Sequence, residues 1–340
     1  MTDRVGVGVI GVGLMGRRHA ENAARRIEGA RLVGVYDAAH EVARRVAADV
    51  GGVAAASADE LLGREDVRVV VIASPSRYHA DHAVAALGAG KDVLLEKPMA
   101  LTLADCDRVI AAAERGRARL QIGFMRRYDP AYAEAHRLIR SGALGQPVLY
   151  TASSRDREPA RVPPADDVAE VLLESAIHDF DGARWLLGDE PARTTVVAGA
   201  VRYGGSSSET PGATLTTLEF ARGALAIVET YRGAGYAYDI RTEIVCADGT
   251  VTIGDRPGDP SGRIEERLVI RTPQAETTVS VPGWLARFAD AYLAELADVV
   301  AGARDRRPVG VTGADGKAAV AIALAGVSSA VRRQAAPVPA

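Results

Sequence analysis

The sequence of 340 residues predicts an α/β protein with two domains. Residues 1–125 are expected to form a doubly wound parallel sheet, because short β-branched runs alternate there with longer alanine-rich runs of helical period. Residues 126–340 are expected to form an α+β domain with a large, mainly antiparallel, open sheet. In that part, strand-like runs follow one another with only turn residues between them. The chain is long enough for each domain to bury its own core.

The first domain is expected to alternate strands and helices. The strands are expected at 5–10, 31–36, 67–73, 92–96 and 120–124. Two helix starts support this spacing, because Ser57 and Thr102 each precede an acidic residue by three positions and can cap the first turn. Gly88 and Gly90 are placed to end the helix that begins near His79.

The second domain begins with a helix expected at 130–140. Its strands are expected at 148–153, 194–203, 214–220, 224–231, 240–245, 251–253, 267–271 and 277–281. Asp248-Gly249 is a strong hairpin signal between two of them. Helices at 285–301 and 315–333 close the chain, and residues 334–340 are expected to be a frayed tail.

Composition excludes several classes of partner. The net charge of -3 shows no basic excess, so nucleic acid is not an expected partner. Cys106 and Cys246 are far apart and form no CxxC or Cys/His cluster, which indicates no metal site and favours the reducing cytoplasm. The N-terminus has no signal-peptide pattern, and the apolar run 318–331 is shorter than the roughly 20 residues that span a bilayer. We therefore expect a packed helix there and no membrane partner.

A glycine loop, Gly11-Val12-Gly13-Leu14-Met15-Gly16, directly follows the first expected strand and opens a helix. In this context it is the fingerprint of a dinucleotide-binding Rossmann domain. Gly11 permits the tight turn, Gly13 lets a pyrophosphate approach the backbone, and Gly16 lets the helix pack closely on the strand. The free amides of the helix N-terminus suit phosphate groups. The alternative is an incidental strand-to-helix turn.

Asp37 follows the second expected strand, about twenty residues after the loop. An acid at this position can accept both ribose hydroxyls of the adenosine half and repels a 2′-phosphate. The sequence therefore predicts NAD rather than NADP. Arg44 and Arg45 lie farther along the next helix and could in principle accommodate NADP.

Three short motifs lie at the carboxyl ends of expected parallel strands: Ser74-Pro75, Glu96-Lys97-Pro98 and Met125-Arg126. The carboxyl edge holds the ligand crevice of a doubly wound sheet, so these groups are expected to meet at the nicotinamide end. The residues expected to contact the cofactor are Gly11, Gly13, Leu14, Met15, Gly16, Asp37, Ser74, Pro75, His79, Glu96, Lys97 and Arg126.

Two residue types suit oxidation of an alcohol. Lys97 is one of only three lysines, and a compact ammonium can hold a hydroxyl oxygen while its proton leaves. His178 follows Glu174 by four positions, hence on one face of a helix, and an imidazole oriented by a carboxylate suits a general base. The alternatives are a surface lysine and a solvated helix histidine. His79 and His82 have no third ligand in view and are interpreted as structural or cofactor-adjacent.

Together these motifs resemble the glucose-fructose oxidoreductase and inositol dehydrogenase family (Gfo/Idh/MocA) over essentially the whole chain. The glycine loop, Glu96-Lys97-Pro98, the histidine helix and the final Ala-Tyr-x-x-Glu-Leu helix around Tyr292 stand in the family order. The segments 121–129, 154–156 and 177–181 look most like myo-inositol 2-dehydrogenases.

The resemblance implies roles for individual residues. Lys97 and His178 would contact the reacting hydroxyl, with His178 as general base and Glu174 as its orienter. The bond from Lys97 to Pro98 would be cis, and Asp37 would be the ribose-binding acid. The residues that would line a polyol pocket and bind substrate are Lys97, Arg126, Asp156, Glu174, His178 and Tyr236.

The expected function is NAD-linked oxidation of a secondary ring hydroxyl of an inositol or related cyclitol. A pyranose sugar or an aminocyclitol remains an alternative substrate. The family usually carries Asp where this chain has Glu174, which leaves open a non-catalytic NAD-binding regulator. The open sheet face and the family habit of pairing through it suggest a homodimer or homotetramer.

Overall fold

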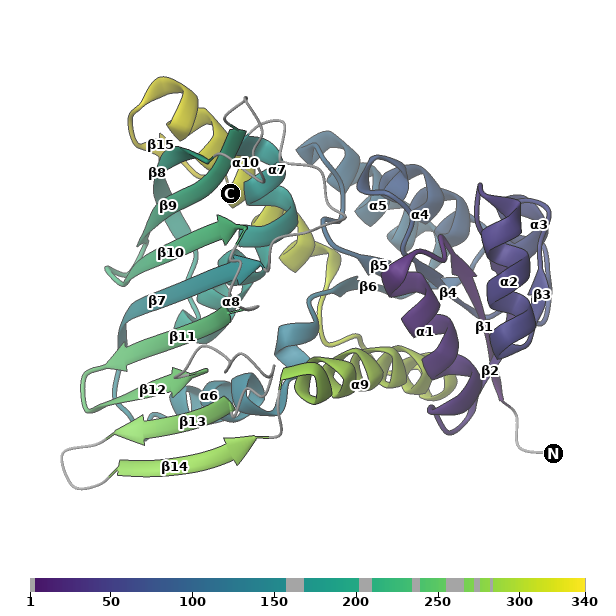
Figure 1. Ribbon diagram of the computed structural model, residues 1–340, viewed down its shortest axis with the longest axis horizontal. Helices are drawn as coiled ribbons and strands as arrows, with labels where there is room; N and C mark the ends of the chain where they lie inside the picture. Colours follow the sequence, from purple (N-terminus) through teal and green to yellow (C-terminus); the bar gives the residue numbers. More distant parts are fainter. Residues whose placement is uncertain are drawn as a thin grey trace. The chain divides into compact units, whose positions relative to one another are not determined.

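The computed structural model describes residues 4–156, 168–201, 210–233, 239–254, 266–271, 276–281 and 284–339. The chain divides into two compact units (Figure 1). The first consists of Met1–Met125 and Asp290–Lys317, and the second consists of Arg126–Ala289 and Ala318–Ala340. The sequence placed the segment Asp290–Lys317 in the second domain, whereas its residues pack with the first.

The first unit contains a six-stranded parallel sheet in the order β3-β2-β1-β4-β5-β6. Its strands are β1 (Val5–Ile10), β2 (Ala30–Tyr36), β3 (Val53–Ala54), β4 (Val69–Ile72), β5 (Asp92–Glu96) and β6 (Leu120–Gly123). Its first helices are α1 (Leu14–Arg25), α2 (His40–Val50), α3 (Ala58–Leu62), α4 (His79–Gly88) and α5 (Leu103–Gly116), with a short turn η1 (Ser76–Tyr78) before α4. The strand order reverses between β1 and β4, which makes a ligand crevice at their carboxyl ends. The expected doubly wound fold is confirmed.

Helix caps stand where the sequence predicts them. Ser57 accepts a hydrogen bond from the Glu60 amide, and Thr102 accepts one from the Asp105 amide. Helix α4 ends at Gly88, and Gly90 follows with a positive φ of 72°. The two-residue strand β3 was not expected, because so short a run carries no periodic signal.

Helix α9 (Trp284–Asp305) explains why residues near the end of the chain belong to the first unit. Leu296, Val299 and Val300 belong to the same buried cluster as Val7 and Val9 of β1. The same cluster includes Ala20 and Ala23 of α1, and in Figure 1 the last turns of α9 meet the lower part of α1. Chain order alone assigned this helix to the second domain, but its apolar face completes the core of the first sheet.

The second unit contains a nine-stranded sheet in the order β14-β13-β12-β11-β7-β10-β9-β8-β15. Its strands are β7 (Pro147–Asp156), β8 (Pro191–Val201), β9 (Thr210–Phe220), β10 (Leu225–Arg232), β11 (Asp239–Cys246), β12 (Gly249–Ile253), β13 (Glu266–Arg271), β14 (Glu276–Val281) and β15 (Ala336–Pro337). Among the described strands of this second sheet, only β7 and β10 pair in parallel. The expected mainly antiparallel sheet is therefore confirmed.

One face of this sheet is covered by α6 (Pro130–Arg140) and by α8 (Ile177–Leu187) (Figure 1). A short helix α7 (Val168–Glu170) and a π-helical turn η3 (Val171–Ala176) lead into α8. Burial alternates along β9 and β10, and the side that does not face these helices carries exposed apolar residues. They are Val197, Leu215, Leu225 and Ile227.

The chain end differs from the sequence expectation. Ala336 pairs with Thr194 of β8, and the Val338 amide donates to the Ala192 carbonyl at 3.0 Å. The predicted frayed tail is therefore wrong at these residues. The reason is that β8 would otherwise be an edge strand with unpaired backbone groups, and the tail supplies the pairing.

Helix α10 (Gly313–Arg332) is the one helix of the described chain that is long and apolar enough to cross a membrane by length and composition. Half of its most apolar window is buried within the protein. Ser329 on this helix donates to the Gln334 carbonyl and accepts from the Val196 amide. A core helix passes the same test of length and composition, so this feature is weak evidence for a membrane span.

Candidate active site

The glycine loop has the geometry that its sequence predicts. Gly11 has a φ of +82°, and a Cβ there would lie 2.4 Å from the Ser74 amide nitrogen. A Cβ at Gly16 would lie 1.8 Å from the Gly11 carbonyl oxygen, so only glycine fits. Around Gly13, by contrast, nothing lies within 4 Å of the Cβ position. The loop is therefore closed against the strands and open on the side where a pyrophosphate would approach.

Helix α1 begins at Leu14 with Gly13 as its N-cap residue, and no side chain caps its first turn. Leu14 is exposed and Met15 is half-buried. The first amides of a helix need acceptors from outside the helix. In α1 they are available to an anion, and this end of the helix also carries the positive end of the macrodipole.

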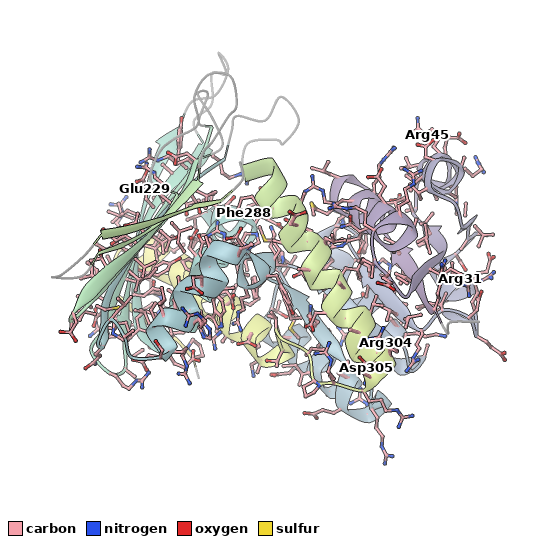
Figure 2. All side chains as sticks on the ribbon, turned by 90° about the horizontal axis from the view of Figure 1, so that it is seen from below. Arg31, Arg45, Glu229, Phe288, Arg304 and Asp305 are labelled. Carbon is pink, nitrogen blue, oxygen red and sulfur yellow. The ribbon has the colours of Figure 1, made fainter. Side chains whose placement is uncertain are left out.

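Asp37 follows the end of β2 and supports this loop directly. One carboxylate oxygen accepts from the Val12 amide at 2.8 Å, and the other accepts from the Ala39 amide at 2.9 Å. Each oxygen keeps a second lone pair, so the carboxylate can still accept ribose hydroxyls. Of the two arginines that could favour NADP, Arg44 bonds to Glu41 at 2.6 Å, and Arg45 is exposed on α2 (Figure 2).

Lys97 lies at the carboxyl end of β5, in a turn held by His79. The Lys97–Pro98 peptide bond is cis. His79 is buried and contacts the Pro98 carbonyl through Nδ1 and the Ser74 carbonyl through Nε2, both at 2.7 Å. His79 thereby joins the ends of β4 and β5, which supports its interpretation as structural or cofactor-adjacent.

Ser74 contributes to the same edge. Its hydroxyl contacts Nδ1 of His82 at 2.9 Å, while the neighbouring Pro75 precedes the turn η1. Burial and the nearby His79 lower the pKa of His82. The neutral ring can then exchange a hydrogen bond with the serine in either direction.

Glu96 was expected to contact the cofactor, and that contact stays a prediction. Its carboxylate is buried and lies 2.9 Å from Nε2 of His19, a residue of α1. Glu295 of α9 is also buried, and one ligand atom from each of the three residues lies within 4.8 Å of the other two. Glu96 directly precedes Lys97, so this cluster adjoins the Lys97 turn. His19 and Glu295 were not identified from the sequence as members of the site.

Glu174 and His178 belong to the second unit, and both are half-buried. Glu174 lies in the π-helical turn η3, whereas His178 lies in the first turn of α8. The expectation that they share one face assumed regular α-helical spacing, which the π-turn alters. Such turns inside helices are frequent at functional sites.

Arg126 is buried and forms an ion pair with Asp179, and its other terminal nitrogen donates to the Ser154 hydroxyl at 3.0 Å. Tyr150 donates to the same aspartate at 3.3 Å, and burial raises the pKa of this phenol well above its usual value. Arg126 was expected to contact cofactor and substrate. Its terminal nitrogens have partners within the second unit, Asp179 and Ser154, and the expected contact with cofactor and substrate stays a prediction. Asp179 was not identified from the sequence.

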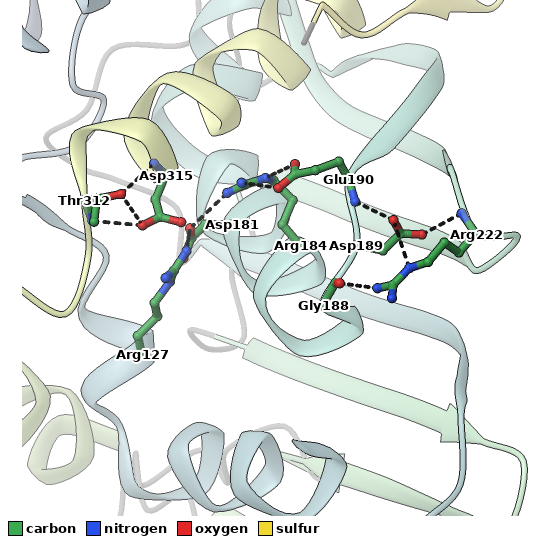
Figure 3. A network of polar contacts seen from close by, with 9 residues as sticks. All are labelled: Arg127, Asp181, Arg184, Gly188, Asp189, Glu190, Arg222, Thr312 and Asp315. Atoms are coloured by element: carbon green, nitrogen blue, oxygen red, sulfur yellow. Dashed lines mark hydrogen bonds and ion pairs between the residues drawn. The ribbon is translucent and has the colours of Figure 1, made fainter. Parts of the chain in front are cut away.

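Arg127 forms the neighbouring pair with Asp181, with two bonds of 2.9 and 2.6 Å (Figure 3). Figure 3 also shows Arg184 between Asp181 and Glu190. The carboxylates directly after His178 thus have arginine partners. Glu174 remains the acid on its N-terminal side.

Two expected substrate residues, Asp156 and Tyr236, lie partly or wholly outside the described residues. The backbone of Asp156 ends β7 and pairs with Arg232, and its side chain lies outside the described residues. Tyr236 lies outside them entirely. Their assignment to a polyol pocket therefore stays a prediction.

The reversed strand order, the glycine loop and the acid after β2 define a dinucleotide-binding Rossmann protein. The chain belongs to the Gfo/Idh/MocA family of oxidoreductases, since the model of that family's NAD-binding Rossmann domain matches residues 5–124 and the model of its C-terminal domain matches residues 132–252.

Individual relatives agree with this assignment. Inositol 2-dehydrogenase 4 of Saccharopolyspora erythraea is 36% identical over 329 residues, which cover 95% of this chain and 92% of that protein. The scyllo-inositol 2-dehydrogenase (NAD(+)) of Bacillus subtilis is 31% identical, covering 97% and 95%. The crystal structure of myo-inositol dehydrogenase from Lactobacillus casei with NAD(H) and myo-inositol matches with a TM-score of 0.84 at 25% identity, covering 99% of this chain and 97% of that one.

Proposed function

We propose that this protein is an NAD-dependent dehydrogenase that oxidises a secondary ring hydroxyl of an inositol or related cyclitol to the ketone. The observation that carries the proposal is the carboxyl edge of the parallel sheet. There Asp37 braces the glycine loop, and His79 holds the turn that presents Lys97. The similarity to inositol 2-dehydrogenases along nearly the whole chain favours a cyclitol substrate.

The residues of the first unit fit NAD. The open space at Gly13, the uncapped start of α1 and the remaining lone pairs of Asp37 suit the pyrophosphate and the adenosine ribose. We also propose that the cofactor contacts Leu14 and Met15 of the loop. Near the nicotinamide, the proposed contacts are Ser74, Pro75, Lys97 and Arg126. Bound NAD supplies the acceptor for the hydride that leaves the substrate carbon.

The chain's own residues handle the proton. We assign His178 as the base that takes the hydroxyl proton, with Glu174 as the carboxylate that orients its imidazole. Lys97 donates a hydrogen bond to the same oxygen and stabilises the negative charge that develops on it. The substrate thus loses one proton to the protein and one hydride from carbon, which leaves a carbonyl.

Initial rates with myo-inositol, scyllo-inositol, other cyclitols and pyranoses, each with NAD and with NADP, test the substrate assignment. We expect the highest kcat/KM with a cyclitol and NAD. A higher value with a pyranose or an aminocyclitol would replace the substrate class. Tight NAD binding without turnover of any compound in the panel would favour a regulatory protein and overturn the enzymatic proposal.

Two variants test the mechanism on the best substrate. Lys97→Ala and His178→Ala should each lower kcat by roughly 10²–10⁴-fold, the usual contribution of a positioned acid–base group. Lys317→Ala is the matched lysine control, because Lys317 pairs with Asp107 on the surface. His136→Ala is the histidine control, since His136 stacks on Trp185. Near wild-type turnover in either test variant would exclude this mechanism.

The exposed face of the nine-stranded sheet supports a proposed assembly. Val197 and Leu215 are direct partners across β8 and β9, and both are exposed together with Leu225 and Ile227 on β10. An apolar sheet face of this kind marks an interaction surface. We assign it to a homodimer, or to a homotetramer that contains the same contact. Light scattering should show at least a dimer, and Leu215→Asp should reduce the mass to that of a monomer.

We place the enzyme in the cytoplasm. Both cysteines are free and buried, and burial raises the pKa of Cys106 to about 12 and that of Cys246 to about 11. Thiols of this kind are unreactive structural residues and suit a reducing compartment.

A further inference from the structure

The cluster that adjoins the Lys97 turn contains two carboxyl groups, Glu96 and Glu295, and one imidazole, His19. His19 of α1 contacts Glu96 at 2.9 Å, whereas neither carboxyl oxygen of Glu295 has a hydrogen-bond partner among the residues that the structure describes. All three side chains are buried. Two carboxylates this close in a low-dielectric interior cannot both remain charged at low cost.

The surroundings decide which acid is charged. Burial acts to raise the pKa of Glu96, but the hydrogen bond and charge of His19, with the charges of Lys97 and His79, outweigh it and lower the pKa. Burial and the negative charge of Glu96 raise the pKa of Glu295 well above its usual value. Tyr292 of α9 contacts the His19 ring edge-on, and the Arg18 guanidinium lies over the Tyr292 ring. The Gln121 side chain of β6 donates a hydrogen bond to the Glu295 backbone carbonyl.

We infer that Glu295 is a neutral carboxylic acid in the folded protein and acts as a positioning residue for Lys97. Its proton leaves Glu96 as the single carboxylate that links the glycine-loop helix α1 to the Lys97 turn. Glu295 lies close enough to share that proton after a small rotation or across one water. The effect on turnover rests on the role proposed for Lys97, whereas the protonation of Glu295 does not.

A bound cation is the competing explanation, because one histidine and two glutamates are a possible zinc ligand set. Ligands of a tetrahedral zinc ion lie roughly 3.3 Å apart, since each sits about 2.0–2.1 Å from the metal. The three ligand atoms lie within 4.8 Å of one another, and Nε2 of His19 is already in contact with Glu96 at 2.9 Å. A proton on Glu295 neutralises the second acid and leaves this contact in place.

Equilibrium unfolding in urea tests the proton directly, because it needs no enzymatic activity. The unfolded chain releases this proton near pH 4.3, whereas the folded wild type keeps it to higher pH. The wild type therefore loses stability as pH rises through this window, and Glu295→Gln does not. We expect the folding equilibrium constant of Glu295→Gln, relative to wild type, to rise by up to about tenfold for each pH unit above roughly 4.3.

Parallel pH dependences of wild type and Glu295→Gln would overturn the inference. Infrared spectroscopy gives a second reading on the wild type alone. A protonated-carboxyl band that remains above about pH 4.3, where an unfolded glutamate is ionised, supports the inference, and its absence there contradicts it. Stoichiometric zinc in the purified protein, lost in Glu295→Gln, would establish a metal site in place of the proton.

Kinetics test the positioning role. Glu295→Ala opens a cavity in this cluster and should lower kcat about tenfold with little change in the substrate KM, whereas Glu295→Gln keeps the shape and neutrality and should restore most of kcat. Equal kcat in Glu295→Ala and wild type would overturn this role. A wild type without activity on any polyol would instead contradict the proposed function and leave the unfolding result standing.

Discussion

The two units each bury a group of carboxylates, and they balance the charge differently. In the second unit Asp179 and Asp181 each pair with an arginine, Arg126 and Arg127, from the turn before α6. In the first unit Glu96 and Glu295 lie close to a single imidazole, that of His19, and it contacts Glu96. Guanidinium groups stay charged at all accessible pH values, so the matched pairs are structural anchors. The unmatched cluster requires a proton, and its contribution depends on pH.

The largest expected effect comes from breaking a matched pair. Asp179→Ala leaves the Arg126 guanidinium buried without its carboxylate, which should cost about 3–5 kcal/mol in the free energy of unfolding. Urea denaturation measures this loss. Replacing both partners together, as Asp179→Val with Arg126→Met, should recover most of it. A single variant as stable as wild type would show that the pair is not an anchor.

A smaller, pH-dependent loss is expected in the first cluster. Glu96→Gln removes the charged partner of His19 and should cost about 2 kcal/mol at neutral pH. The pKa of Glu96 is lowered in the folded state, so its stabilisation is present above about pH 4.3, the value of an unfolded glutamate, and is lost as pH falls below it. Urea titrations at several pH values should show the gap to wild type closing in acid. If the difference in stability between Glu96→Gln and wild type grew in acid, Glu295 and not Glu96 would be the charged carboxylate.

Asp37 represents a third arrangement, in which its carboxylate is held by backbone amides and by no cation among the residues that the structure describes. Asp37→Ser keeps a short polar side chain and removes the charge that repels a 2′-phosphate. The ratio of kcat/KM for NAD to that for NADP should fall about tenfold, which corresponds to roughly 1.4 kcal/mol. An unchanged ratio would mean that another group sets the cofactor preference.

The smallest effect is expected at an exposed pair. Glu134 and Arg137 lie one turn apart on α6, at 2.7 Å, and both are exposed to solvent. Glu134→Gln should leave the urea midpoint unchanged, because water screens the pair. It is the matched control for Asp179→Ala. If Glu134→Gln lost as much stability as Asp179→Ala, burial would not distinguish the exposed ion pair from the buried one.

Much of the cofactor half could be predicted from the sequence because its signals are local. The glycine loop, the caps at Ser57 and Thr102 and the alternation of strands and helices each depend on neighbouring residues. Glu295 gave no such signal, because it is far from Glu96 in sequence and meets it through the packing of α9. His19 lies one turn after Gly16, but the loop motif does not include it.

The sequence by itself determined the two architectures, the glycine loop and its acid, and the ends of the strands that carry Lys97. Only the tertiary structure decided that Asp290–Lys317 completes the first unit, that the chain end pairs with β8, and that Arg126 is bound by Asp179. Local conformation follows from residues a few positions apart. Charge balance and the filling of a core depend on contacts between residues that are distant in sequence.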